Sequence, residues 1–257
     1  PGGGVWARDN DRWQLFDKGG TLLGTADWLI VAGSGVAHPR WTNTFGGDPP
    51  LVAAIQASQL ENDNLNRALE AIAKQEASPV LAVFWYCVGE EAKVWCELPF
   101  AVAQLSDNDV LSKVCVQRLE SGACSVVLHS TKEFALQNTG VYGKSSSAAR
   151  VGDATSDASR EDLIINELLD ALAGVNLPPV PDKCSYGPLL HRWGNAFPKG
   201  EALAEELSLC GNNANVAFCG DYTETDARMG SVEAALLSGT EIGNRIAHHE
   251  SDRASGL

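Results

Sequence analysis

The residues best suited to chemistry stand late in the chain, where an apolar run ends in an acidic turn. Residues 216–219 (Val-Ala-Phe-Cys) are typical of a short buried strand, and Gly220-Asp221 follows directly. A carboxylate at a strand end accepts hydrogen bonds from ligand hydroxyl groups, each worth about 1.5–3 kcal/mol when charge-assisted. The pattern therefore predicts a binding site around Asp221, although an ordinary turn aspartate explains the same residues.

A helix predicted from about residue 230 to 248 follows this turn, and its start favours negative charge. The backbone amides near Gly230, Ser231 and Val232 have no helical acceptor, and with the helix dipole they stabilise a negative charge by up to ~2 kcal/mol. A reduced flavin, which is negative at N1 and O2, is one ligand that fits. Glu233 lies in the same turn, where an acidic side chain stabilises a helix with or without a ligand.

One face of this helix is predicted to be unusually smooth. Small residues stand at every fourth position, at Ala235, Gly239 and Gly243. Side chains four apart lie on the same side of a helix, so small ones let another backbone or a flat cofactor approach closely. We expect the helix to pack through this face. Its members are Val232, Ala235, Leu236, Gly239, Ile242, Gly243 and Ile246.

A second glycine pattern matches a dinucleotide phosphate loop only in part. Gly33-Ser34-Gly35 follows an apolar run at 28–32, but His38 stands where the third glycine is needed and a proline comes next. The fingerprint needs a helix whose N-terminal amides face the pyrophosphate. We therefore expect a turn or loop here, and no other G-x-G-x-x-G occurs in the sequence.

His191-Arg192-Trp193 is the best candidate for contacts with a substrate. Arg192 can pair with a phosphate or a carboxylate, and Trp193 can stack on a planar ring. A structural role at a junction between domains explains the three residues equally well. His129, at the end of a predicted strand, is interpreted as a structural histidine.

The rest of the sequence predicts the elements that position these residues. A hairpin over 13–24 leads into a buried strand at 28–32, and Pro49 or Pro50 suits the first turn of a helix. The spacing of the later strands favours an antiparallel sheet over βαβ units. Ser159 with Asp162 is typical of a capping box. The other expected elements are helices at 51–60, 65–74, 131–137 and 159–173, strands at 79–88, 92–96, 113–118 and 125–129, a surface loop at 143–159 and an extended segment at 184–193.

Charge and hydropathy narrow the set of partners. The 257 residues carry 19 Lys and Arg against 33 Asp and Glu, a formal net charge of −14. A field of this sign repels phosphate backbones and anionic lipid, so we expect neither a nucleic-acid nor a membrane partner. The longest apolar run, residues 80–88, is about half of the ~18 residues that a membrane span requires.

The sulfur-containing residues bear on the compartment and on the length of the protein. The seven cysteines include no C-x-x-C pair, and this odd set suits neither a disulfide framework nor a zinc site. We interpret them as small buried hydrophobes and expect an intracellular reducing compartment, the cytoplasm or an organelle.

The only methionine is Met229 and the chain opens at Pro1, so we expect a part of a longer protein.

Five landmarks along nearly the whole chain carry a resemblance. In chain order they are residues 28–41 with A-H-P-R-W at their end, Phe45-Gly46 with Pro49-Pro50-Leu51, His129-Ser130 with Phe134-Ala135, His191-Arg192-Trp193 with Ala196 and Pro198, and Gly220-Asp221 with residues 230–235 and Ser238-Gly239. The last resembles the C-terminal flavin-binding motif of FAD-dependent amine oxidases and their relatives. The set as a whole is most similar to the renalase-like branch.

The resemblance implies FAD as the cofactor and a fold of mixed class, α/β plus α+β. An incomplete Rossmann-like FAD-binding domain, residues 1–45 and 191–257, would carry an inserted antiparallel-sheet substrate domain, residues 46–190. Gly220 and Asp221 would lie at the ribitol or pyrophosphate region of FAD. The amides of Ser231 and Val232 would face the pyrimidine edge of the flavin. The loop after Ala32 would pass near the cofactor, and Gly230 and Glu233 match the motif.

The resemblance also implies a reaction. A small-molecule donor, either an amine or a dihydronicotinamide-type compound, would give a hydride to flavin N5, and dioxygen would reoxidise the flavin. The family's strand–G-x-G-x-x-G–helix, which holds the ADP half of FAD, is absent from this sequence. A non-catalytic binding or interaction protein that retains the fold is therefore the alternative, and the sequence leaves both open.

Overall fold

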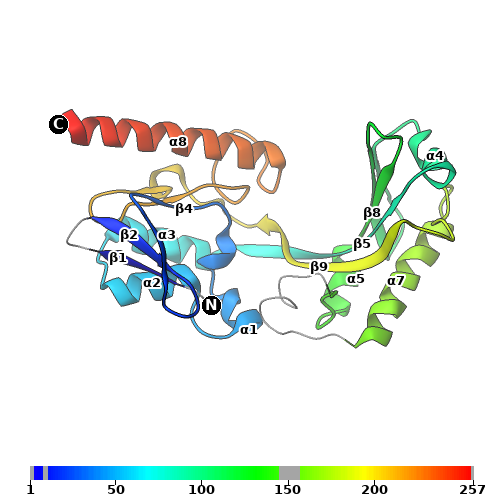
Figure 1. Ribbon diagram of the computed structural model, residues 1–257, viewed down its shortest axis with the longest axis horizontal. Coiled ribbons are helices and arrows are strands. Elements are labelled where there is room, and N and C mark those ends of the chain that lie inside the picture. Colours follow the sequence, from blue (N-terminus) through cyan, green and yellow to red (C-terminus); the bar gives the residue numbers. More distant parts are fainter. Residues whose placement is uncertain (1–2, 8–10, 145–156, 256–257) are drawn as a thin grey trace. The chain divides into compact units, whose positions relative to one another are not determined.

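The chain forms two compact units, which the computed structural model shows in Figure 1. The residues described are 3–7, 11–144 and 157–255. Unit 1 comprises residues 1–77 and 197–257, and unit 2 comprises residues 78–196. These limits differ from the predicted division at 45/46 and 190/191, because the two helices that follow Pro49 pack into the core of unit 1.

Unit 1 begins with an antiparallel sheet of three strands in the order β1 (Gly3–Ala7), β2 (Arg12–Phe16) and β3 (Leu22–Ala26). The predicted hairpin corresponds to β2 and β3 and is confirmed, while β1 is an addition to it. Trp13 of β2 is fully buried, and its indole N–H donates to the carbonyl oxygens of Ala214 and Asn215 at 3.0 and 3.2 Å. This side chain therefore fixes the hairpin to the second sheet of the unit.

The second sheet of unit 1 holds the segment on which the candidate site depends. Its order is β10 (Leu209–Cys210), β11 (Val216–Phe218) and β4 (Leu29–Val31), and β11 runs parallel to β4. All three residues of β11 are buried, as their apolar character requires. The predicted strands at 28–32 and 216–219 are thus confirmed.

Helices cover these sheets. α2 (Pro50–Ser58) has its proline at the first helical position, as predicted, and α3 (Asp63–Lys74) is capped by Asn62, whose side-chain oxygen accepts the Leu65 N–H at 2.9 Å. Between β4 and α2 lie a single 3₁₀ turn, η1 (Ser34–Val36), and the short α1 (Arg40–Phe45). The expected turn after Gly33 is therefore confirmed. A second 3₁₀ turn, η2 (Glu205–Leu207), precedes β10.

The last helix, α8 (Val232–Ser255), packs through a face that overlaps the predicted one only in part. Its buried residues are Ala234, Ser238 and Ile242, whereas Val232 and Leu236 are 87% and 71% exposed. Ile242 and Ile246 of the predicted face do pack, but Val232 and Leu236 do not, so the predicted face was wrong in part. The buried hydroxyl of Ser238 accepts the Gly220 N–H at 2.8 Å. A prediction from the spacing of apolar residues alone does not include such a polar contact.

Unit 2 is built on a five-stranded sheet. The antiparallel pairings of β6 with β7, β7 with β8 and β5 with β8 confirm the predicted sheet type. Leu81, Val83 and Trp85 of β5 alternate onto one face and are fully buried. The strand order is β6 (Val102–Gln104), β7 (Leu111–Arg118), β8 (Cys124–Ser130), β5 (Glu76–Cys87) and β9 (Tyr186–Lys199).

Helices cover the buried face of this sheet. α7 (Ala158–Ala173) buries Ile164, Leu168 and Leu172, and α5 (Lys132–Gln137) is the predicted short helix. The cap of α7 is Asp157, whose carboxylate accepts the Ser159 N–H at 2.9 Å, so the predicted capping box at Ser159 was wrong. Residues 145–156 of the expected surface loop lie outside the described residues.

The predicted strand at 92–96 was also wrong, because this segment is the helix α4 (Glu90–Cys96). It starts after Gly89, whose φ of 66° ends β5 and turns the chain. Ala92 and Trp95, three residues apart, lie on one side of the helix and are both fully buried.

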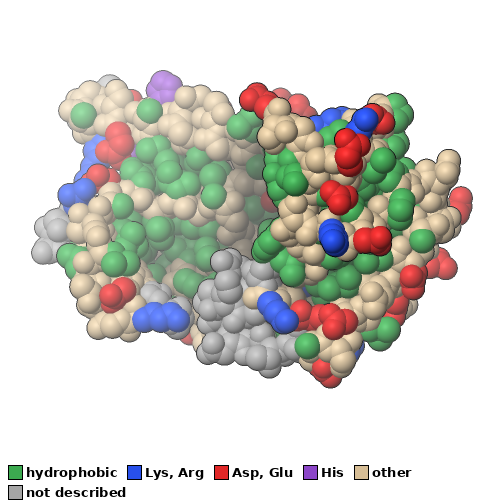
Figure 2. All heavy atoms as spheres, turned by 45° about the vertical axis from the view of Figure 1, so that its right-hand side comes forward, with side chains coloured by type: hydrophobic (Ala, Val, Ile, Leu, Met, Phe, Trp, Pro, Cys, Tyr) green, Lys and Arg blue, Asp and Glu red, His purple; other side chains and the backbone are tan. Residues whose placement is uncertain are grey.

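Acidic side chains are scattered over the face of unit 2 that is turned to the viewer in Figure 2, in keeping with the net charge of −14. No helix in the described part of the chain has the length and apolar character that crossing a bilayer takes. The described residues also contain no group of three or more His, Cys, Asp or Glu side chains arranged to hold a metal ion.

Replacing Leu168 with alanine is expected to lower the free energy of unfolding of unit 2 by about 2–5 kcal/mol, because the fully buried side chain leaves a cavity. Leu163→Ala in the same helix is the matched control, since Leu163 is 56% exposed and its loss should change stability by about 0.5 kcal/mol or less. Urea unfolding followed by circular dichroism measures both. Equal effects would contradict the packing of α7 on the sheet.

Candidate functional site

The candidate site lies where β4 and β11 end. Their parallel pairing brings both carboxyl ends to the same edge of the sheet, and the Cys219 N–H still donates to the Val31 carbonyl at 3.1 Å. Gly220 follows with a φ of +130°, and a Cβ placed on it would stand 2.7 Å from the Ala32 carbonyl oxygen. The structure thus brings together three of the predicted cofactor-binding residues, Ala32, Gly220 and Asp221.

Asp221 presents a carboxylate with little local support. The side chain is half-buried, and among the described residues only its own backbone N–H is a hydrogen-bond donor to it. Desolvation raises the pKa of this carboxyl above its ordinary value. A partly desolvated carboxylate with free lone pairs is a strong acceptor for hydroxyl groups of a ligand.

The backbone of Asp221 also sets the position of α8. Its carbonyl accepts the Gly230 N–H at 2.8 Å, so the loop from 222 to 229 returns to the end of β11 before the helix starts. Ser231 then caps the helix, because its hydroxyl oxygen accepts the Ala234 N–H at 3.0 Å. Gly230 has a φ of +81°, which suits a glycine at this turn.

The first turn of α8 leaves two amides free. The Ser231 N–H donates to the Arg228 carbonyl at 3.2 Å, whereas the N–H groups of Val232 and Glu233 have no acceptor in the described part of the chain. Val232 is also 87% exposed. The start of α8 therefore offers two donors and the positive end of the helix dipole beside the Asp221 turn.

The loop that follows Ala32 is held by a buried histidine. His38 is 5% exposed; its Nδ1 accepts the Arg40 N–H at 3.0 Å, so Nε2 carries the proton and donates to the Gln75 carbonyl at 2.9 Å. Burial lowers the pKa of His38, which keeps the ring neutral. The residue that breaks the glycine fingerprint thus has a structural role in unit 1.

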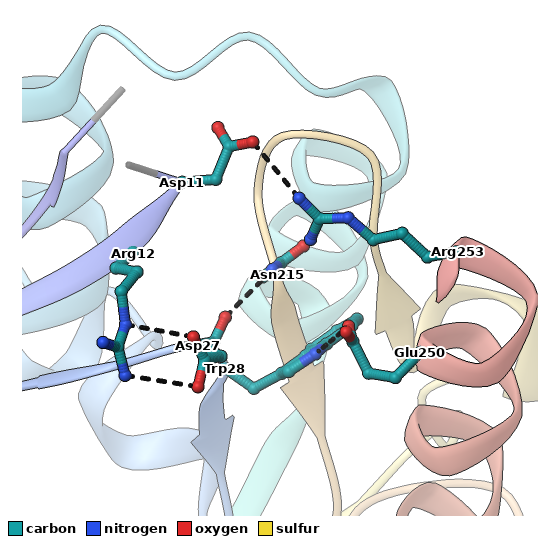
Figure 3. Close-up of polar contacts among 7 residues, drawn as sticks. All are labelled: Asp11, Arg12, Asp27, Trp28, Asn215, Glu250 and Arg253. Atoms are coloured by element: carbon teal, nitrogen blue, oxygen red, sulfur yellow. Dashed lines mark hydrogen bonds and ion pairs between the residues drawn. The ribbon is translucent and has the colours of Figure 1, made fainter. Parts of the chain in front are cut away.

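Figure 3 shows polar contacts near the far end of α8, one of which joins the helix to Trp28, directly before β4. The Trp28 indole N–H donates to the Glu250 carboxylate at 2.8 Å, which lowers the pKa of that carboxyl. The Asn215 amide donates to the Asp27 carbonyl at 2.9 Å and so holds the start of β11 beside the start of β4. The ion pairs drawn beside them, Arg12–Asp27 and Arg253–Asp11, are solvent-exposed and contribute little.

The predicted substrate-contacting residues His191, Arg192 and Trp193 belong to β9 in unit 2. Arg192 donates through Nη1 to the carbonyl oxygens of Ala135 and Asn138 at 2.9 and 3.1 Å, which satisfies the end of α5. The rings of His191 and Trp193 lie 4.4 Å apart, and Trp193 is 53% exposed. Arg192 is therefore held by structural hydrogen bonds, while Trp193 presents an exposed ring beside the half-buried His191.

Sequence reasoning missed the second face of the sheet in unit 2. Phe84 and Tyr86 alternate with the buried residues of β5, and the Phe84 ring lies 6.3 Å from that of Tyr186, which is 56% exposed. His129 stands on this face opposite Lys113, and burial together with the lysine charge lowers the pKa of the histidine. The alternation of side chains along β5 could have predicted this surface, because residues two apart in a strand lie on the same face of the sheet.

No protein-family model matches the sequence, and no curated protein matches it. Cyclohexylamine oxidase from Brevibacterium oxydans IH-35A resembles the structure with a TM-score of 0.52 and 14% identity, over 98% of this chain and 48% of that chain. The chain has the fold of part of an amine oxidase. It spans about half the length of the solved structures that it matches.

Two further solved structures are similar at lower scores. A double mutant of putrescine oxidase with redesigned cofactor binding has a TM-score of 0.49 and 13% identity, over 96% of this chain and 48% of that chain. An oxidoreductase from Methanosarcina mazei has a TM-score of 0.45 and 10% identity, over 93% of this chain and 48% of that chain.

Gly220→Ala is expected to cost about 1–3 kcal/mol of stability, because the new Cβ would meet the Ala32 carbonyl at 2.7 Å and the backbone φ is strained for any other residue. Gly239→Ala is the control. Nothing lies within 4 Å of a Cβ there, and alanine in a helix interior gains about 0.5–1 kcal/mol over glycine. Thermal unfolding of both variants tests the close approach. A neutral Gly220→Ala would show that the two strand ends do not meet.

Proposed function

We propose that this protein is an FAD-dependent oxidoreductase in which a small-molecule donor gives a hydride to the flavin. The observation that carries the proposal is the grouping of the Asp221 carboxylate with the free amides of Val232 and Glu233 at one edge of the sheet. The amine-oxidase fold supports it.

The residues present fit a flavin. A dinucleotide of this kind carries ribityl and ribose hydroxyls, which need acceptors, and an electron-rich pyrimidine edge, which needs donors. Asp221 supplies the acceptor, and the start of α8 supplies the donors and a favourable dipole. Gly220 has no side chain at this edge, where a Cβ would collide with the Ala32 carbonyl oxygen.

The proposal gives each of these residues a defined task. Asp221 binds hydroxyl groups of the ribityl or ribose region, since a carboxylate repels the pyrophosphate itself. Of the two amides predicted to face the pyrimidine edge, that of Ser231 is engaged by Arg228, so Val232 takes this task and Glu233 is the second donor. When bound, FAD supplies the hydride acceptor, and these residues hold and orient it.

The ADP half of FAD needs residues that this sequence does not contain, since it has no G-x-G-x-x-G. The open edge of β4 is a suitable place for a strand that carries such a motif. Leu29 and Val31 bond to the β11 side, so the N–H and C=O of Ile30 face the open edge, and Ile30 is 51% exposed. An apolar groove of about 540 Å³ lies beside that edge and is lined in part by Ile30, Val36 and Leu51.

The substrate side of the proposal rests on unit 2. We propose an amine or a dihydronicotinamide-type donor and dioxygen as the electron acceptor. Within unit 2, the exposed Trp193 ring beside His191 and the half-exposed aromatic face of the sheet offer stacking surfaces for a planar donor. Arg192 acts by holding α5 and β9 together.

Asp221→Asn in the full-length protein is expected to weaken FAD binding about 10-fold or more, because a charge-assisted hydrogen bond is lost. Asp226→Asn is the matched control, since that aspartate is exposed in the same loop. Fluorescence titration with FAD measures both dissociation constants. Equal affinities in the two variants would show that Asp221 is only a turn residue.

The same substitution makes a pH prediction for the FAD-free protein. The folded-state pKa of Asp221 is raised, so the folded chain binds this proton more readily than the unfolded chain does. The stability of the wild type relative to Asp221→Asn should therefore fall as pH rises from 3.8 through the raised pKa, and stay low above it. Urea unfolding of both proteins across this range gives the difference, and a difference that instead grows with pH in favour of the wild type would contradict the desolvation of Asp221.

A further inference from the structure

Two thiols face each other across neighbouring strands in the core of unit 2. Cys87 ends β5 and Cys124 begins β8, and the two residues are direct partners in the antiparallel register. Their sulfur atoms lie 3.6 Å apart, and both side chains are fully buried. Cys96, which is half-buried, is a further thiol beside Cys124, so the pairing of Cys87 with Cys124 is singled out by the strand register and by full burial.

The backbone at this position already suits a disulfide. Directly opposed residues of antiparallel strands have Cα atoms about 4.5–5.5 Å apart. Disulfides span Cα separations of about 4.4–6.8 Å. A rotation of the two side chains is therefore enough to bring the sulfurs from van der Waals contact to bonding distance, with no shift of the strands.

We propose that Cys87 and Cys124 form an intramolecular disulfide when the protein meets hydrogen peroxide. One sulfur, as the thiolate, attacks a peroxide oxygen; the O–O bond breaks, a sulfenic acid forms, and the other oxygen leaves as water after taking up a proton. The second thiol then attacks the sulfenic sulfur, so that the S–S bond forms and the S–O bond breaks with release of a second water. Two electrons and two protons pass from the thiols to the peroxide.

The surroundings of the pair make this reaction slow, because they keep both thiols protonated and out of contact with solvent. Burial raises the pKa of Cys87, and burial raises the pKa of Cys124 to about 12, so the thiolate is scarce. α4 covers the pair, with the Ala92 carbonyl 3.9 Å from the Cys124 sulfur. Because both thiols are fully buried, the reaction requires local opening of unit 2 around them, so sustained rather than brief exposure to peroxide drives it.

The disulfide would change the stability of unit 2. It closes the segment from residue 87 to 124, which contains α4, β6 and β7, into a covalent loop and restricts the unfolded chain. The melting temperature of unit 2 should therefore rise on oxidation and return on reduction. The proposal does not depend on the flavin chemistry, although a flavin oxidase produces the same oxidant.

The test is treatment of the native full-length protein with added hydrogen peroxide, followed by alkylation in denaturant and peptide mapping. The wild type should lose two of the seven thiols of this chain, yield one linked peptide pair containing Cys87 and Cys124, and regain both thiols with dithiothreitol. Cys115→Ser, which alters a half-buried thiol of neighbouring β7, should still lose two thiols. Cys87→Ser should lose none.

Three results would overturn the proposal. In one, all seven thiols survive a peroxide treatment that oxidises them in the unfolded chain. In another, the linked peptides join other cysteines, such as the half-buried Cys96. In the last, Cys87→Ser folds and still loses two thiols. Should Cys87→Ser not fold, the peptide map of the wild type decides alone.

Discussion

The parallel pairing of β4 with β11 is the constraint on which the candidate site depends. Parallel strands place their carboxyl ends at one edge, and here that edge holds Ala32 on one strand and Gly220-Asp221 on the other. The two backbones approach so closely that only glycine fits at 220, and Tyr222 fills the space beneath it while its hydroxyl donates to the Val31 carbonyl at 2.8 Å. The Asp221 carboxylate that follows is half-buried, and among the described residues only its own backbone N–H donates to it.

Helix α8 converts that edge into a site with both acceptors and donors. One buried hydroxyl, Ser238, accepts the Gly220 N–H and so fixes the distance between the helix and the turn, while the Trp28–Glu250 contact holds the other end of the helix. The free amides of the first turn then stand beside an acceptor with a raised pKa. A partly desolvated carboxylate whose one described donor is its own backbone N–H costs stability in the free protein, which is a common feature of residues kept for binding.

Most of the secondary structure and the core of the candidate site could be predicted because the signals are local. The apolar run at 216–219, the Gly220-Asp221 turn and the following helix are contiguous, as are the hairpin and the proline start of α2. The failures each have a tertiary cause. α4 contains two buried residues three apart in a segment whose composition suits a strand, and the packing face of α8 is set by the contact of Ser238 with Gly220. The division into units also followed from packing, since α2 and α3 join a core that their sequences do not specify.

We propose that the edge formed by Asp221 and the start of α8 binds FAD. The most direct test is the absorption spectrum of the purified full-length protein, followed by release of the cofactor on denaturation and its identification by chromatography and mass spectrometry. We expect a flavin spectrum and about one FAD released per chain. A colourless protein that takes up no FAD when the cofactor is added would contradict it and would favour a binding protein that keeps the fold without the chemistry.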